Sequence, residues 1–401
     1  MSTHIPEPKV MQAQCSYCGD APVNHTLSYL ESFLAFTVDR RLSVLSNHAP
    51  KFLKRFADWI PISIFKLLTK IGLAHFSSDI DKACSFRSRI IWEEAQRRGI
   101  HMEQLVIGKK PIDWYRTLQN GKYVFFESLP ILPEFLDLAQ NWDDKIILKK
   151  ELALHNVPIP QYLEVPFFKQ QSLEDIFNSF KKPVIIKPRI GSRARHTITN
   201  INTLQHFKEG LRIAGEISSH LVVEEHIHGH VCRATVVGGT LAGFYRGTSP
   251  FIIGDGVTTI RALIEEKDKA RPNRVEAVRV GDELRHTLSR AGYGIDDVLP
   301  EGTILPLSHR IGRLFGGTTK EMIDELHPSF IPIIEKAGKA VGLAVAGFDC
   351  IIPDPTKDAE GQRWGIIECN TLPFIDLHYY ALEGKPRNIA GMIWDLWDNK
   401  N

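Results

Sequence analysis

The segment spanning residues 344–370 constrains the fold of this chain more than any other part of the sequence. In it, two apolar runs flank the polar, turn-rich stretch PDPTKDAEGQR, a pattern that predicts two antiparallel strands joined by a loop. Asp349 and Glu368 lie almost symmetrically about the middle of that stretch, so we expect them to face each other across the strands. Asn370 follows Glu368 by two residues and is expected on the same face.

Two carboxylates that face each other repel, and a sheet with a purely structural role would avoid such a pair. A divalent cation between Asp349 and Glu368 would remove the repulsion. With the amide oxygen of Asn370, these carboxylates form a set of hard oxygen ligands that suits Mg²⁺, with Mn²⁺ as an alternative. The competing interpretation is a register shifted by one residue, which would turn one acid toward solvent.

Two lysines occupy positions where a positive charge needs an anionic partner. Lys187 ends the β-branched run 184–186, so its ammonium group is expected at the edge of a core, where a lysine requires a partner. Lys145 follows Asp144 in the first turn of a helix predicted to end near residue 155, where the helix dipole disfavours a cation. Both lysines could bind phosphate, although each taken singly could also lie on a solvated surface.

A strongly basic loop follows Lys187 and contains one glycine, Gly191. Its basic side chains are Arg189, Arg193, Arg195 and His196. Such a loop can hold phosphate groups through its side chains, or it can be a solvated cluster of charges.

A second strand is predicted over residues 221–227 and contains the adjacent acids Glu224 and Glu225. An adenine ring lying against this strand would form hydrogen bonds with backbone groups, and one acid could accept a hydrogen bond from the exocyclic amine. The alternative is that both acids face solvent, as acids at the ends of strands commonly do.

The first 84 residues are predicted to be mainly helical and carry no readable function. Cys15 and Cys18 form a CxxC pair, but no second CxxC follows, and His25 and His48 have no standard ligand spacing. We therefore expect two ordinary thiols in preference to a metal site.

Residues 51–70 combine five basic side chains and one acid with large apolar side chains. The stretch could bind a membrane surface or an acidic partner. We expect instead a pair of amphipathic helices that is broken at Pro61 and packed on the body of the protein.

With 401 residues, the chain is long enough for two or three domains, which we predict at 1–84, 85–140 and 141–395. Its 49 Lys and Arg residues balance 47 Asp and Glu residues, so it has no overall field that would attract nucleic acid. We find no secretory signal and no run of the ~18–20 apolar residues that a transmembrane helix needs. Six cysteines are too few for a disulfide scaffold, and we expect a cytoplasmic protein.

Residues 141–395 resemble an ATP-grasp ligase domain, most closely the type in cyanophycin synthetases and bifunctional glutathione synthetases. The resemblance rests on several motifs in a fixed order: DK leading to VPIP, VIIKP, VVEEHIHG, FYRG, GDGVTTIRALI, AGFD, ECN and LEGKPRNIAGMIWDLW. It implies an α+β, ATP-grasp fold in which two α/β subdomains grip ATP. Residues 85–140 are similar to the small α/β domain that precedes this fold.

The sequence pattern and the resemblance together imply a role for each candidate residue. The residues implied for binding ATP are Lys145, Lys187, Arg193, Glu224, Glu225 and Ile227. The residues implied for binding Mg²⁺ are Asp349, Glu368 and Asn370. The catalytic residues implied to face the transferring phosphate or the substrate carboxylate are Arg246 and Arg233.

The family chemistry is the activation of a carboxylate as an acyl phosphate, followed by attack of an amine and release of ADP and phosphate. The resemblance therefore implies a ligase for small-molecule carboxylate and amine substrates, such as an amino acid or small peptide, with a homo-oligomer left open. The alternatives are phosphoryl transfer to a hydroxyl on the same scaffold, and a non-catalytic nucleotide-binding regulatory protein.

Three features depart from the family pattern. Val231 stands where many members carry an acid for the ribose hydroxyls, which affects the expected nucleotide preference. The glycine-rich loop after VIIKP reads GSRARHT, which puts its movement as a lid in question. The sequence ends without the further ligase domain of cyanophycin synthetases, so we do not expect a polymerase with two ligation sites.

Overall fold

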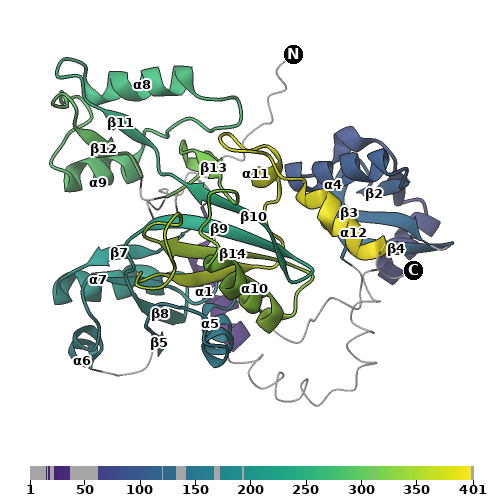
Figure 1. Cartoon of the computed structure of the whole chain (residues 1–401), viewed down its shortest axis with the longest axis horizontal. Helices are drawn as coiled ribbons and strands as arrows, with labels where there is room; N and C mark the ends of the chain where they lie inside the picture. Colours follow the sequence, from purple (N-terminus) through teal and green to yellow (C-terminus); the bar gives the residue numbers. More distant parts are fainter. Residues whose placement is uncertain are drawn as a thin grey trace.

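The computed structural model describes residues 15, 17–18, 22–36, 62–119, 121–131, 141–166, 172–191, 194–308 and 310–398. Within these residues, neighbouring strands pair antiparallel in several separate sheets, and helices cover the sheets (Figure 1). The architecture is therefore α+β, as predicted. No described helix combines the length and the apolar character that crossing a membrane requires.

The sheet at the centre of the molecule carries the predicted carboxylates. Its strands are β9 (His230–Val237), β10 (Thr240–Gly247), β13 (Thr319–Glu321), β14 (Val345–Ile352) and β15 (Gly365–Asn370). They are arranged in the order β13–β10–β9–β14–β15 (Figure 1). An apolar core that includes Leu148 and Phe330 joins this sheet to two helices, α5 (Lys145–Leu154) and α10 (Phe330–Val341).

A second sheet has the order β5–β8–β6–β7. Its strands are β5 (Tyr162–Pro166), β6 (Val184–Pro188), β7 (Ile198–Ile201) and β8 (His220–Glu225). Its helices are α6 (Leu173–Asn178) and α7 (Leu204–Gly215), which pack on it through a core of their own. The strands predicted around residues 184–186 and 221–227 are confirmed as β6 and β8.

A smaller unit is inserted between β10 and β13 of the central sheet. It contains β11 (Phe251–Ile253), β12 (Ile304–Pro306), α8 (Ile260–Ala270) and α9 (Asp282–Arg290), and the short 3₁₀ helix η4 (Arg313–Phe315) follows it. Thr259 caps α8 by accepting a hydrogen bond from the backbone N–H of Ala262 at 3.4 Å. An apolar core that includes Ile260 and Leu305 holds the unit together.

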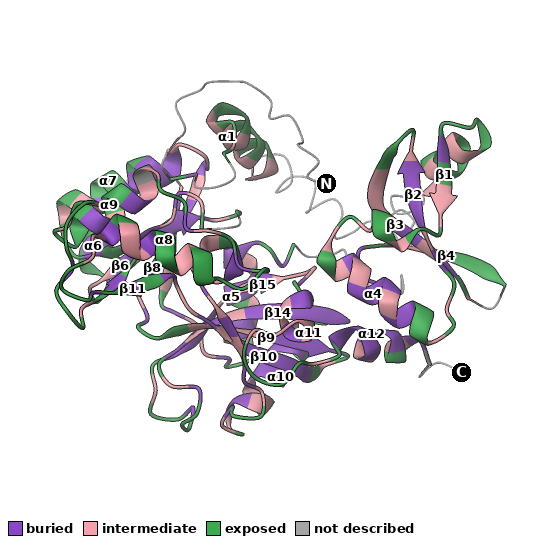
Figure 2. Ribbon diagram, turned by 90° about the horizontal axis from the view of Figure 1, so that it is seen from above, coloured by how far each residue is buried: buried purple, intermediate pink, exposed green. Residues whose placement is uncertain are grey.

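The remaining sheet has its strands in sequence order. The strands are β1 (Ala74–Ser77), β2 (Met102–Ile107), β3 (Lys110–Gln119) and β4 (Lys122–Glu127), and the helices around them are η2 (Ile80–Lys82), α4 (Phe86–Arg97), α11 (Asp376–Tyr379) and α12 (Ile389–Asp398). Helix α12 lies beside α4 (Figure 2), and the indole N–H of Trp394 donates to the carbonyl of Ile91 over 3.1 Å. The C-terminal helix thus completes the core of an N-terminal unit. The domain boundaries remain predictions, and β1 lies before residue 85.

Among the described residues, two helical segments precede this sheet in the sequence. The first is α1 (His25–Leu34), and the second covers residues 62–70. In the second, Phe65 contacts Trp114 on β3, with ring centroids 5.1 Å apart. This is the second helix of the predicted pair; residues 51–61, with the break at Pro61, lie outside the described residues.

Candidate functional site

The carboxylates of the predicted hairpin face each other across β14 and β15. These strands pair antiparallel, with Asp349 opposite Glu368 and Gly347 opposite Asn370. The predicted register is therefore confirmed. Phe348 and Cys350, the residues before and after Asp349 on β14, both belong to the apolar core. Because side chains alternate along a strand, Asp349 lies on the opposite face of the sheet.

A β-bulge in β15 sets the direction of Glu368. The pairing shifts after Asp349, which leaves Ile367 as an extra residue without a partner in the ladder. Because of this extra residue, Ile366 and Cys369 both belong to the apolar core although three positions separate them. Glu368 consequently lies on the face opposite the core, with Asp349.

Arg233 supplies a positive charge next to the carboxylate pair. It lies opposite Asp349 on β9, and its Nε and Nη2 donate to the two carboxylate oxygens over 2.6 and 2.7 Å. Burial alone would lower the pKa of Arg233, but the combined effect of Asp349, Tyr245 and Glu368 outweighs burial and raises the pKa. Arg233 thus neutralises part of the negative charge of Asp349 and Glu368, a role that the sequence pattern had attributed to a metal ion alone.

Gly347 and Asn370 complete this part of the site. A Cβ atom at Gly347 would lie only 2.7 Å from Pro373 Cβ, so the glycine allows Pro373 to pack against β14 at this point, whereas Arg233 Cδ, at 3.7 Å, would be at an ordinary contact distance. Asn370 Nδ2 lies 3.5 Å from Asp349 Oδ2. The structure therefore brings the two carboxylates and the amide together, and this set of oxygen donors fits a hard divalent cation, provided that the amide turns its oxygen inward.

The structure does not bring Arg246 to the same place. Arg246 on β10 pairs with Cys232, which pairs with Cys350 on β14. Both cysteines belong to the apolar core, so by register Arg246 lies on the face opposite to Asp349. Its buried Nε has no hydrogen-bond partner among the described residues. Of the two predicted arginines, only Arg233 contacts the carboxylate pair.

A buried cluster of lysines around one carboxylate, called here the lysine cluster, lies at the four-stranded sheet β5–β8–β6–β7. Glu224 on β8 binds Lys187 on β6 through Oε2 at 2.8 Å and Lys149 on α5 through Oε1 at 2.9 Å. Burial would raise the pKa of Glu224, but the two lysines outweigh it and hold the pKa below its usual value. Burial lowers the pKa of Lys149 to about 8, and the nearby Lys187 adds to this effect.

A third buried lysine leaves this cluster with more positive than negative charge. Lys145 begins α5 behind the cap Asp144, whose side chain accepts from the N–H of Ile146 over 2.8 Å. The Lys145 ammonium is almost fully buried and donates to the carbonyl of Gly191 at 3.0 Å. Its charge acts on the nearby Lys149. Since buried charges are costly unless they are paired, this third lysine beside the group of Lys149, Glu224 and Lys187 favours an additional anion.

Lys149 connects the lysine cluster to the carboxylate pair. Its Nζ binds Glu224 on the four-stranded sheet and also donates to the carbonyl of Ile367 at 3.0 Å. Ile367 is the bulge residue directly before Glu368. One ammonium group therefore bridges the two sheets, and the positive and negative parts of the site adjoin each other.

The other residues predicted to bind ATP have different surroundings. Glu225 pairs with the guanidinium of Arg363 and accepts from the backbone N–H of Gln161 at 3.1 Å. Ile227 is buried beyond the end of β8. Arg193 lies outside the described residues, so its predicted role is not addressed by the structure.

Lys149 is the member of the site that sequence reasoning missed. It lies four residues after Lys145, and residues at that spacing share one face of a helix. A second lysine on the same face of a predicted phosphate-binding helix was therefore a readable signal. The pairing of Arg233 with Asp349 had no such signal, because 116 positions separate the two residues.

Comparisons with known proteins extend this description. No protein-family model matches the chain. The cyanophycin synthetase of Trichormus variabilis is 31% identical over 263 residues, which cover 63% of this chain and 29% of that protein. The glutathione biosynthesis bifunctional protein GshAB of Mannheimia succiniciproducens is 27% identical over 323 residues, which cover 75% of this chain and 41% of that protein. The chain thus spans less than half the length of these curated relatives.

A solved structure shares the fold. The bifunctional glutathione synthetase from Pasteurella multocida superposes with a TM-score of 0.55 at 21% identity, over 80% of this chain and 44% of that one. At this level of identity the likeness concerns the fold, and it extends over most of the elements described above.

Proposed function

We propose that this chain, which has the ATP-grasp fold and is related in sequence to carboxylate–amine ligases, is itself an ATP- and Mg²⁺-dependent ligase. It would join a small-molecule carboxylate to the amine of an amino acid or small peptide. The observation that carries the proposal is the bridge through Lys149 between the lysine cluster and the carboxylate pair. Phosphoryl transfer needs cations for the phosphates directly beside ligands for a metal ion.

In this proposal the lysine cluster receives the nucleotide. Lys145 and Lys187 would bind the phosphates, and the backbone around Ile227 would contact adenine. Glu224 Oε1 lies near Lys149 Nζ but has no well-directed hydrogen bond among the described residues. This buried acceptor suits the exocyclic amine of adenine.

The carboxylate pair would hold the metal. Asp349, Glu368 and Asn370 supply the donors, and Mg²⁺ bound there would neutralise charge on the phosphate oxygens. Arg233 lies on the same face, so it would orient the transferring phosphate or the substrate carboxylate once the metal shares the charge of Asp349. The support for Arg246 in this role is weaker, because its register puts it on the other face.

The proposed reaction has two steps. A substrate carboxylate oxygen attacks the γ-phosphorus of ATP, the bond to the bridging oxygen breaks, and ADP leaves. An amine then attacks the acyl phosphate, phosphate leaves with the electron pair, and the amine loses a proton. The chain's residues contribute alignment and electrostatic stabilisation, without a covalent nucleophile.

The direct test is ADP release from Mg-ATP with a panel of amino acids and dipeptides. We expect Glu368→Gln to lower ADP release at least ~100-fold, because it removes a metal ligand whose charge acts in the transition state. Glu360→Gln, at an exposed position in the loop of the same hairpin, is the matched control and should retain full activity. Undiminished ADP release by Glu368→Gln would refute the assignment of the metal site.

The acyl phosphate can be tested separately. With an accepted carboxylate and hydroxylamine in place of the amine, we expect a hydroxamate to form in proportion to ADP. ADP release without hydroxamate would contradict an acyl phosphate and favour phosphoryl transfer to a hydroxyl. A cytoplasmic location and a homo-oligomeric state remain predictions.

A further inference from the structure

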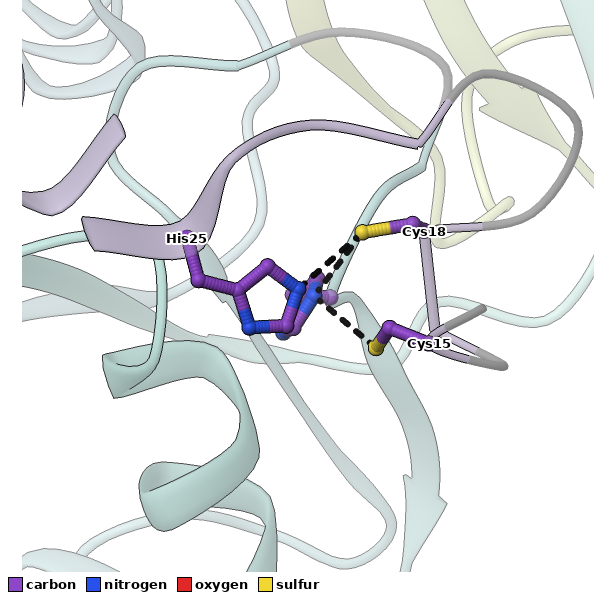
Figure 3. A group of neighbouring side chains, drawn as sticks. Cys15, Cys18 and His25 are labelled. Carbon is purple, nitrogen blue, oxygen red and sulfur yellow. Dashed lines mark hydrogen bonds between the residues drawn. The ribbon is translucent and has the colours of Figure 1, made fainter. Parts of the chain in front are cut away.

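Four side chains with soft or borderline metal-binding atoms meet outside the proposed active site. The ligand atoms of Cys15, Cys18, His25 and His196 all lie within 4.8 Å of one another. Cys18 Sγ lies 3.2 Å from His25 Nε2 and 3.5 Å from His196 Nε2, and Cys15 Sγ lies 3.6 Å from His196 Nε2. Figure 3 shows Cys15, Cys18 and His25 pointing toward one another.

These distances match the edges of a metal-centred tetrahedron. Zinc binds thiolate sulfur at about 2.3 Å and imidazole nitrogen at about 2.0–2.1 Å, which places sulfur and nitrogen ligands about 3.6 Å apart at the tetrahedral angle. The observed separations of 3.2–3.6 Å lie near this value. Two cysteines and two histidines also form one of the standard ligand sets of closed, structural zinc sites.

The backbone around the cluster holds the ligands in place. The N–H of Cys18 donates to the carbonyl of Cys15 at 3.1 Å, which closes a tight turn between the two thiols. The N–H of His196 donates to the carbonyl of Tyr17 at 3.0 Å, which attaches that turn to the basic loop after β6. Cys18 and His196 are completely buried.

The second ring nitrogens of both histidines are directed by other groups. His196 Nδ1 lies 2.7 Å from the carbonyl oxygen of Ile213, to which it must donate, so Nε2 is the unprotonated nitrogen that faces the thiols. Glu216 Oε2 lies 3.6 Å from His25 Nδ1. A carbonyl or carboxylate behind each ligating histidine is typical of metal sites.

An independent observation shows that this region needs an anchor. Helix α1, which begins with His25, has no buried residue, and Figure 2 shows it only in the colours of intermediate and exposed residues. Leu27 and Leu30 are 54% and 50% exposed. A helix of this length is marginal without a packed face. The Cys–His cluster at its start and the hydrogen bonds of Ser32 with Ser218 and Ser219 attach α1 to the neighbouring sheet unit.

We propose that Cys15, Cys18, His25 and His196 bind one Zn²⁺ ion that ties the N-terminal segment to the loop between β6 and β7. The site is structural, because four protein ligands leave no open coordination position. It differs from the expectation of two ordinary thiols, because the fold brings the CxxC pair together with His25 and with His196, which lies 178 positions from Cys18. The proposal is independent of the ligase activity, and metal content tests it directly.

The first test is zinc analysis of the full chain, purified without a polyhistidine tag from zinc-sufficient medium. We expect about one Zn²⁺ per chain, and less than about a tenth of that for Cys18→Ser and for His196→Gln. Cys84→Ser and His101→Gln, at exposed positions on another sheet unit, are matched controls and should keep the metal. A wild-type chain that neither contains zinc nor takes it up on addition would overturn the proposal.

A second pair of variants guards against loss of metal through unfolding. His25→Cys offers a third thiolate and should retain zinc, whereas His25→Gln should lose it, with both variants showing the wild-type circular dichroism of the folded core. Co²⁺ in the wild type should give the intense visible bands of a tetrahedral site, and His25→Cys should strengthen the thiolate charge-transfer band. Equal zinc content in both variants, or a Cys15–Cys18 disulfide in the freshly purified chain, would contradict the proposal.

Glu216 provides the finest test, as a positioning residue behind His25. We expect Glu216→Gln to weaken zinc affinity about 10–100-fold without changing the number of ions bound. Competition with a chromogenic chelator measures the zinc affinity of both proteins. An unchanged affinity would show that Glu216 does not orient His25 and would count against the proposed geometry.

Discussion

The two charged regions of the candidate active site differ in the sign of their charge: one is mainly acidic and the other mainly basic. On the central sheet, Asp349 and Glu368 place two negative charges beside one guanidinium, that of Arg233. At the neighbouring sheet, Lys149 and Lys187 place two positive charges around Glu224. Neither region balances its charges, and the sign of the excess charge is opposite in the two.

This difference indicates what each region is suited to bind. The carboxylate pair is half-buried and made of hard oxygen donors, so a divalent cation can complete it. The lysine cluster is deeply buried and offers only ammonium donors, so a polyphosphate can complete it. A magnesium nucleotide carries both charges in one ligand, and Lys149 holds the two regions next to each other. The predictions below test this complementarity by removing the central charge of each region.

The largest effect is expected from Glu224→Gln. It leaves two buried lysines without their carboxylate, which should lower the free energy of unfolding by about 3–5 kcal/mol. Pyrophosphate should stabilise this variant more than the wild type, because it supplies the missing negative charge. Chemical denaturation with and without pyrophosphate measures both effects.

The adjacent acid is the control for this experiment. Glu225 pairs with Arg363, whose side chain is 50% exposed, so Glu225→Gln should cost no more than about 1 kcal/mol. Equal losses for the two variants would mean that the buried cluster is no more sensitive than a surface pair.

A somewhat smaller loss is expected from Arg233→Met. The side chains of Arg233 and Asp349 are 13% and 16% exposed, and removing the guanidinium should cost about 3 kcal/mol, at the lower end for a broken buried pair. Mg²⁺ should restore much of this loss, because it replaces the positive charge between the carboxylates. Thermal unfolding in the presence of EDTA and of Mg²⁺ gives the comparison.

Arg246→Met serves as the control on the same sheet. Because Arg246 lies on the other face, its variant should show no stabilisation by Mg²⁺ beyond that of the wild type. If Mg²⁺ stabilised both variants equally, the face assigned to Arg246 would be wrong.

The smallest effect is a pH dependence due to Lys149. The pKa of Lys149 is about 8 in the folded chain, compared with the ordinary lysine value of 10.5 that we expect in the unfolded chain. Between pH 8 and pH 10.5 the unfolded chain therefore binds more protons than the folded chain. The free energy of unfolding therefore rises with pH over this interval, by about 1 kcal/mol per pH unit from this group. Lys149→Met should remove that slope, as measured by urea unfolding across the interval.

The control is Lys150→Met, one residue further along α5 and exposed to solvent. This variant should keep the wild-type slope. A wild-type slope that Lys149→Met leaves unchanged would show that the buried lysine does not titrate in this range.

Much of the fold was predictable because its signals are local. The ATP-grasp fold predicted from ordered motifs is confirmed by the likeness to known proteins. Asp144 and Thr259 begin α5 and α8 by accepting hydrogen bonds from N–H groups two or three residues ahead. The facing of Asp349 and Glu368 followed from the symmetry of a single turn. Strand β3 was not predicted, and the bulge at Ile367 had no signal in the pattern of apolar residues.

The sequence by itself determined the elements and the acids of the hairpin, since backbone capping, side-chain alternation and turn formation act over a few residues. Only the tertiary structure decided which distant charges and ligands meet: Arg233 with Asp349, Lys149 with Glu224, and His196 with the thiols of the N-terminal segment. These long-range contacts depend on the order of strands in a sheet and on the packing of one sheet against another. A local pattern cannot encode them, because strand order and packing are settled by contacts spread over the whole chain.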